Sequence, residues 1–130
     1  MTWKMHIDDV PEEHRAWSWE GHDYERYRKE FSVAFGNDGS YPFDVELARV
    51  PPGAAPCPVH EHSAMWEFFI IVSGTGEVHR NGETATVGAG ECFLQPAGTR
   101  HRVRNASDAE DLVYYLIANE TPPEVTKHEA

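Results

Sequence analysis

A regular succession of short strand-forming segments and turn signals constrains the fold of this chain more than any other feature. From residue 43 onward, apolar and β-branched stretches alternate with glycine- and proline-containing turns. The strongest turn signal is Asn81-Gly82, which favours a two-residue type I′ hairpin between the predicted strands 77–80 and 83–87. The other predicted strands are 43–50, 67–72, 91–95, 101–105 and 112–118. Short strands with turns of this kind predict an all-β, double-sheet jelly roll.

The first forty residues have a different composition from the rest. They are rich in charge and carry the aromatic residues Trp3, Trp17, Trp19, Tyr24, Tyr27, Phe31 and Phe35. The segment 24–35 fits both a helical stripe and a strand, and we favour an extended arm that adds to a sheet. At 130 residues the chain is one domain. We expect an N-terminal arm at 1–40 that packs on the barrel or a partner, a barrel at 41–120 and a C-terminal tail at 121–130.

The charge and the cysteine content exclude several classes of partner. A formal net charge of −11 argues against nucleic acid and anionic membranes, because both require clustered Lys and Arg. No stretch approaches the roughly 20 apolar residues of a membrane span. The N-terminus lacks the apolar region of a signal peptide, so we expect a cytoplasmic protein. In that compartment Cys57 and Cys92 are expected to be free thiols.

Three histidines and one glutamate have the spacing of a metal site. His60 and His62 alternate along the chain, so in a strand both imidazoles point to the same face. Glu67 follows after a short turn, and His101 arrives from a separate hairpin. Nitrogen ligands with one carboxylate suit first-row transition metals rather than calcium or magnesium. The remaining histidines, for which we expect solvated surface positions, are His6, His14, His22, His79 and His128.

Together with their flanking glycines, these residues resemble the two signature motifs of the cupin superfamily. The first reads Gly53-x6-His60-x-His62-x4-Glu67-x6-Gly74, with six residues after Gly53 where the family most often has five. The second reads Gly90-x5-Pro96-x-Gly98-x2-His101-x3-Asn105. The resemblance implies a double-stranded β-helix. It also implies one divalent transition metal per chain, which is iron, manganese, nickel or zinc, held by His60, His62, Glu67 and His101.

The resemblance implies two classes of function. The first is a metalloenzyme with dioxygenase-, isomerase- or lyase-like activity on a small polar, carboxylate or carbonyl substrate, in which Glu67 acts as a base as well as a ligand. The alternative is a non-catalytic module that binds or senses a small molecule. Further candidate pocket residues are Gln95, Tyr114 and Tyr115, although packing roles are the simpler interpretation of all three.

The strand after the first motif predicts a covered outer face. If Glu67 points inward, Phe69 and Ile71 point inward with it, whereas Phe68 and Ile70 point outward. An apolar outer face requires cover, either from the N-terminal arm or from a second subunit. Since small cupins commonly form dimers, we expect a homodimer.

Overall fold

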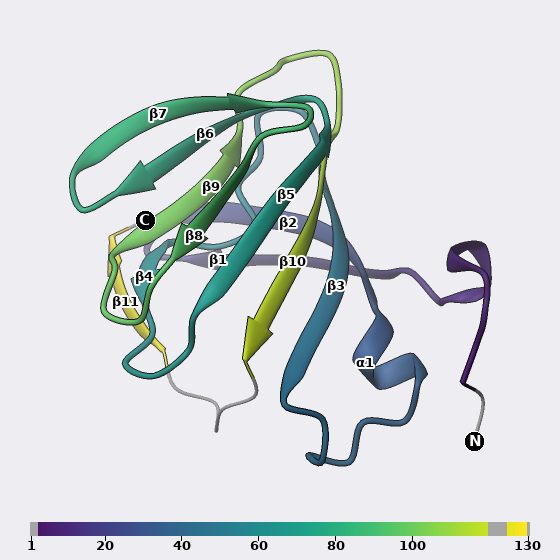
Figure 1. Cartoon of the computed structure of the whole chain (residues 1–130). Helices are drawn as coiled ribbons and strands as arrows, with labels where there is room; N and C mark the ends of the chain where they lie inside the picture. The colour runs from purple at the N-terminus through teal and green to yellow at the C-terminus, as the bar shows by residue number, and fades with distance from the viewer. Residues whose placement is uncertain (1–2, 120–124, 130) are drawn as a thin grey trace.

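Two antiparallel β-sheets face each other and enclose a hydrophobic interior (Figure 1). The computed structural model describes residues 3–119 and 125–129. In spatial order, the first sheet contains β1 (Glu13–Trp19), β2 (His22–Glu30), β3 (Phe43–Val50), β10 (Leu112–Asn119), β5 (Glu67–Ser73) and β8 (Cys92–Gln95). The second sheet contains β11 (Thr126–Glu129), β4 (Val59–Glu61), β9 (His101–Asn105), β6 (Thr75–Arg80) and β7 (Glu83–Gly88). This is a double-stranded β-helix, and the predicted fold class is confirmed.

In residues 3–119 and 125–129, helical structure is confined to single turns. These are η1 (Ile7–Asp9) and α1 (Phe31–Ala34). Within the described residues, no helix has the length and apolar character needed to cross a membrane.

The hairpin predicted at Asn81-Gly82 joins β6 to β7. Asn81 has a φ of 48° and Gly82 a φ of 83°, and a type I′ turn needs positive values at both positions. The turn sets the register in which Arg80 pairs with Glu83. The predicted strand 77–80 is extended to begin at Thr75, because Gly76 and Thr75 also pair with β7.

Gly74 and Asn105 have structural roles that explain their places in the two motifs. Gly74 has a φ of +86°, and a Cβ atom at this position would lie 2.3 Å from the carbonyl oxygen of Asp111. Only glycine fits this crossing of two backbone segments. The buried Asn105 side chain donates hydrogen bonds to the carbonyl oxygens of Val50 (2.9 Å) and Glu110 (2.7 Å). These residues fix the loops at the end of the barrel away from His101.

The interior follows the alternation predicted for β5. Glu67, Phe69 and Ile71 are buried, with exposed fractions of 6%, 4% and 1%. The Phe69 ring stacks on Phe93 of β8 at a centroid distance of 4.7 Å. The core cluster consists of Ala48, Val50, Phe69, Ile71, Val78, Val103, Leu112 and Tyr114. Glu67 therefore lies at one end of a continuous apolar core.

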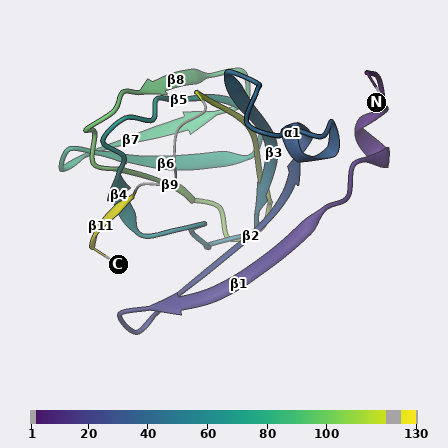
Figure 2. The same ribbon diagram turned by 90° about the horizontal axis from the view of Figure 1, so that it is seen from below.

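The N-terminal segment adds a hairpin to the first sheet. β1 pairs with β2, and β2 pairs with β3, so the segment extends the sheet at its edge. In Figure 2 this hairpin curves beneath the barrel toward β11. Lys127 of β11 meets it there, with its ammonium group 5.2 Å from the centre of the Trp17 ring. We favoured an extended conformation for residues 24–35, and β2 has it as far as Glu30. The short helix α1 begins at Phe31.

The outer face of β5 and β8 remains partly open to solvent. Phe68 is 36% exposed and Leu94 is 39% exposed. We expected the N-terminal arm or a second subunit to cover this face. The arm instead extends the sheet beyond β3. It also contacts the outer face through Phe31, whose ring centroid lies 6.3 Å from that of Tyr115. Cover by a second subunit stays a prediction.

The described part of the predicted tail contains a strand. β11 pairs with β4, so that Lys127 lies opposite His60. This strand was not among those predicted, because its residues are polar and carry no alternation. Residues 121–124 and 130 of this predicted tail lie outside the described part of the chain.

Candidate metal centre

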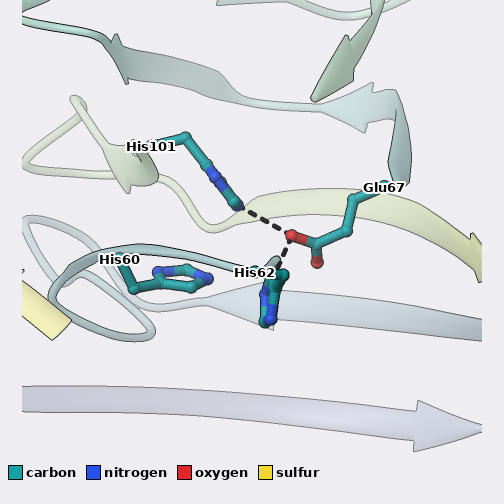
Figure 3. Close-up of side chains that lie close together, drawn as sticks. All are labelled: His60, His62, Glu67 and His101. Carbon is teal, nitrogen blue, oxygen red and sulfur yellow. Dashed lines mark hydrogen bonds and ion pairs between the residues drawn. The ribbon is translucent and has the colours of Figure 1, made fainter. Parts of the chain in front are cut away.

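The four predicted ligands lie together at one end of the barrel (Figure 3). Their nearest donor atoms, one from each of His60, His62, Glu67 and His101, are all within 4.8 Å of one another. His60 in β4 is directly opposite His101 in β9. His62 follows the end of β4, and Glu67 begins β5 in the other sheet. The cluster therefore joins the two sheets, and its geometry depends on the complete fold.

Backbone carbonyl groups fix the orientation of two imidazoles. The Nδ1 atom of His60 lies 2.9 Å from the carbonyl oxygen of Pro58, and Nδ1 of His101 lies 2.8 Å from that of Thr99. A carbonyl oxygen only accepts, so each Nδ1 carries the proton and each Nε2 presents its lone pair in the neutral ring. A hydrogen bond from the ring nitrogen that does not face the cluster to a backbone carbonyl is typical of histidine ligands in metal sites.

The contact between His101 and Glu67 shows that the cluster fits a cation. His101 Nε2 lies 2.7 Å from Glu67 Oε1, and His62 Nε2 lies 3.3 Å from the same oxygen. With Nδ1 protonated, a neutral His101 offers a lone pair toward a carboxylate that also only accepts. Two facing acceptors are stable only with a proton or a metal ion between them. The donor set therefore suits a divalent transition metal.

The protonation states of the cluster also favour cation binding. Burial, together with the neighbouring His101, lowers the pKa of His60 to about 4. Burial raises the pKa of Glu67, but the proton that its short contacts with His101 and His62 require in the absence of a metal ion outweighs that effect and holds the pKa at about 2. At neutral pH, His60 is thus uncharged and Glu67 is ionised, as metal ligation requires.

The cluster opens into a cavity of about 510 Å³, which the N-terminal hairpin borders. Its lining also contains Glu46 of β3, Arg28 of β2 and Tyr114 of β10. Burial raises the pKa of Glu46, against the opposing charges of Arg26 and Arg28. Burial likewise raises the pKa of Tyr114 well above its usual value. The cavity thus places a carboxyl and a phenol group with raised pKa values, together with cationic side chains, beside the four-residue cluster.

The other candidate pocket residues have separate positions. Tyr114 lines the main cavity, whereas Tyr115 packs near Phe31 on the outer face. Gln95 is buried and pairs with Glu67 in register, but it lines a second, smaller cavity. Cys57 lies 3.6 Å from Nδ1 of His60, and burial raises its pKa to about 12. It is therefore a neutral thiol beside the cluster rather than a thiolate ligand.

The charged residues of the cavity other than Glu67 were not predicted from the sequence. They include Arg26, Arg28 and Glu46. The alternation in β3 offered a signal for Glu46, since it shares an inward face with Ala48 and Val50. No such signal existed for the two arginines, because the pairing of β2 with β3 depends on a contact between distant segments.

Comparison with known proteins identifies the family to which the barrel is similar. The family model described as "Cupin domain" matches residues 46–118, which include all four residues of the cluster. A curated relative, an oxalate-binding protein of Thermotoga maritima, is 27% identical over 62 residues, or 48% of this chain. The chain spans only about half (50%) of that relative's length.

Solved structures show the same fold at low sequence identity. A cupin-superfamily sugar phosphate isomerase from Silicibacter pomeroyi is 22% identical, with a TM-score of 0.79 over 98% of this chain and 82% of that one. The polyketide cyclase RemF of Streptomyces resistomycificus is 20% identical, with a TM-score of 0.75 over 98% of this chain and 85% of that one. At this identity the comparisons support the architecture, and the chemistry must be argued from the site.

Proposed function

The chain belongs to the cupin domain family, and we propose that it is a metal-dependent enzyme acting on a small carboxylate or carbonyl compound. The supporting observation is the cluster of His60, His62, Glu67 and His101, whose donor atoms converge within 4.8 Å beside a cavity of small-molecule size. We propose these four side chains as the ligands of one iron, manganese, nickel or zinc ion per chain. Such an ion, when bound, polarises a carbonyl or carboxylate oxygen.

Glu46 of the cavity lining would supply proton transfer. Glu46 lies in the cavity with its Oε2 3.6 Å from Nη1 of Arg28, which holds the carboxyl group in place. Because burial raises its pKa, Glu46 is a better proton carrier near neutral pH than an exposed glutamate. Glu67 has the opposite character, since its pKa is held at about 2. We therefore assign proton transfer to Glu46 and metal ligation to Glu67. From the sequence alone, Glu67 was the candidate for both roles.

Two substitutions separate these roles. Glu67→Gln removes the anionic ligand, so metal content should fall together with any turnover. Glu46→Gln should retain metal and lose turnover, because the amide cannot carry the proton. The measurements are elemental analysis and turnover on a panel of small acids, sugars and catechols, with oxygen consumption recorded. Full activity in Glu46→Gln would contradict its assignment, and wild-type metal content in Glu67→Gln would contradict the ligand set.

A non-catalytic function is the second candidate, and one observation favours it. The curated relative with 27% identity is an oxalate-binding protein, so a related barrel binds a small dicarboxylate. The same compound panel distinguishes the two functions. Product formation or oxygen consumption supports the enzyme, whereas saturable binding without turnover supports a binding or sensing module.

We also propose that the protein is a homodimer formed through the outer face of β5 and β8. Phe68 and Leu94 are 36% and 39% exposed on this face, and burying apolar area of this kind is favourable. Phe68→Glu should convert the dimer to a monomer in sedimentation equilibrium. Ile7→Glu is the control, because Ile7 is similarly exposed (40%) but lies in η1. A wild-type monomer would contradict the proposal.

A further inference from the structure

The N-terminal hairpin supplies a cationic wall to the cavity from outside the segment that the family model matches. β1 and β2 span residues 13–30, whereas the family match begins at residue 46. Arg15 and Trp17 of β1 and Arg26 and Arg28 of β2 all line the cavity. Arg15 lies directly opposite Arg26 in the register of the hairpin. The hairpin, seen beneath the barrel in Figure 2, thus brings several hydrogen-bond donors to the same space as the metal cluster.

Most cations of this wall already have a stabilising contact. Arg28 is paired with Glu30 at 2.6 Å and with Glu46 at 3.6 Å. Two cations lie over the Trp17 ring. Cζ of Arg15 is 4.7 Å and Nζ of Lys127 is 5.2 Å from the ring centre. These contacts explain why the fold tolerates several positive charges along one edge of the cavity.

Arg26 differs from its neighbours. Among the ion pairs of the described residues, none within 4.0 Å involves Arg26, and its Nε atom is buried with no hydrogen-bond acceptor. The indole Nε1 of Trp17 is buried without an acceptor in the same way. Each buried donor without an acceptor costs about 1–3 kcal/mol, and a charged donor costs more. Two such donors on adjacent strands of one cavity wall indicate a ligand that brings acceptor atoms.

Arg26 borders the same cavity as the metal cluster. The lining of this cavity includes Arg26, Cys57 and all four residues of the cluster. The sulfur of Cys57 lies 3.6 Å from Nδ1 of His60. Arg26 and the cluster thus border one volume of about 510 Å³, in which a single small molecule can contact both.

We propose that Arg26 forms an anion-binding subsite, with Trp17 Nε1 as a second donor, and that the substrate is an anion with two functional ends. One end is an oxygen donor for the metal ion, which rests on the proposed function. The other end is a carboxylate or phosphate group held by the guanidinium of Arg26. Guanidinium matches both groups through paired N–H donors. The cavity of about 510 Å³ has room for a molecule that spans both positions.

Isothermal titration calorimetry on the metal-loaded, full-length protein tests this subsite. Two probe pairs differ by one anionic group: acetate with succinate, and glycolate with phosphoglycolate. In the wild type, the second anionic group should increase affinity about tenfold or more in at least one pair, as expected for a charge-assisted hydrogen bond. The pair that shows the increase tells whether the subsite prefers carboxylate or phosphate.

Three variants assign the increase to Arg26. Arg26→Gln should reduce the affinity ratio of each responding pair to near one, and Arg26→Lys should restore part of it. Arg104→Gln is the control, because it also removes one positive charge, but from a half-buried site on β9 beside Glu77. An unchanged ratio in Arg26→Gln, or no gain from a second anionic group in either wild-type pair, would overturn the proposal.

Elemental analysis of the same samples keeps the two proposals distinct. Metal uptake depends on the four cluster residues, whereas the affinity ratio depends on Arg26. A wild-type protein that takes up no metal would contradict the proposed function. A protein with full metal content and no second-anion gain would contradict only the subsite.

Discussion

Acidification of the metal-free protein should destabilise the fold through a single histidine. The pKa of His60 is lowered from 6.5 to about 4 because its imidazole is buried beside His101. The unfolded chain therefore binds a proton at this residue before the folded chain does. Stability is fully present above pH 6.5 and is lost as the pH falls from 6.5 toward 4.

The size of the effect follows from the two pKa values. Each pH unit between them is worth about 1.4 kcal/mol, so complete protonation costs about 3 kcal/mol. Between pH 7.5 and pH 5, the expected loss is about 2 kcal/mol. Glu67 does not contribute in this range. Its pKa is lowered to about 2, so its stabilising effect is present above pH 4.5 and is lost only as the pH falls toward 2.

Urea unfolding of the chelator-treated protein at the two pH values measures this loss. His60→Asn is the informative variant, because its amide can still donate to the Pro58 carbonyl but cannot take up a proton. The variant should lose about 2 kcal/mol less stability than the wild type between pH 7.5 and pH 5. His79→Asn is the matched control, since His79 is partly exposed and pairs with Glu77 on the surface. Equal losses in the wild type and His60→Asn would refute the burial argument.

Three further predictions concern the metal, a motif glycine and the N-terminal hairpin. The purified protein should hold about one divalent metal ion per chain by elemental analysis, and His60→Ala should lose most of it while His79→Ala keeps it. Gly74→Ala should destabilise the protein by about 2–4 kcal/mol in urea unfolding, because it adds positive-φ strain and a clash with Asp111. A decrease in the free energy of unfolding of less than about 1 kcal/mol would contradict this. A variant lacking residues 1–40 should aggregate or lose its dimer in sedimentation experiments, since it exposes the edge of β3, and a soluble, dimeric, metal-bound product would show that the hairpin is dispensable.

The sequence was sufficient to predict the parts of the fold that depend on local chemistry. Asn81-Gly82 defined a hairpin because few dipeptides adopt positive φ at both central positions. The bounds of β3 and β9 agree with the predicted strands 43–50 and 101–105, since proline, glycine or a polar loop ends each of them. The four cluster residues were also identifiable, because they occupy the ligand positions of the two motifs that resemble those of the cupin superfamily.

The parts that were not predictable depend on contacts between distant segments. β2 carries charged side chains on both faces, so its strand character comes from pairing with β1 and β3 rather than from alternation of apolar residues. β11 is held in the same way by β4. No local signal in the sequence showed that Arg26 and Glu46 would meet in one cavity, because residues on separate strands are brought together only by the register of the sheet.

The site likewise combines residues that the sequence motifs identified with residues that only the sheet pairing brings to the cavity. The candidate metal cluster lies within the segment that the family model matches. The cavity beside it is lined partly by the added hairpin, whose Arg26 and Trp17 present donors without acceptors. Binding energy from such contacts discriminates among substrates that the metal alone would treat alike. The choice of substrate should therefore change with substitutions in β1 and β2, and the capacity to hold metal should not.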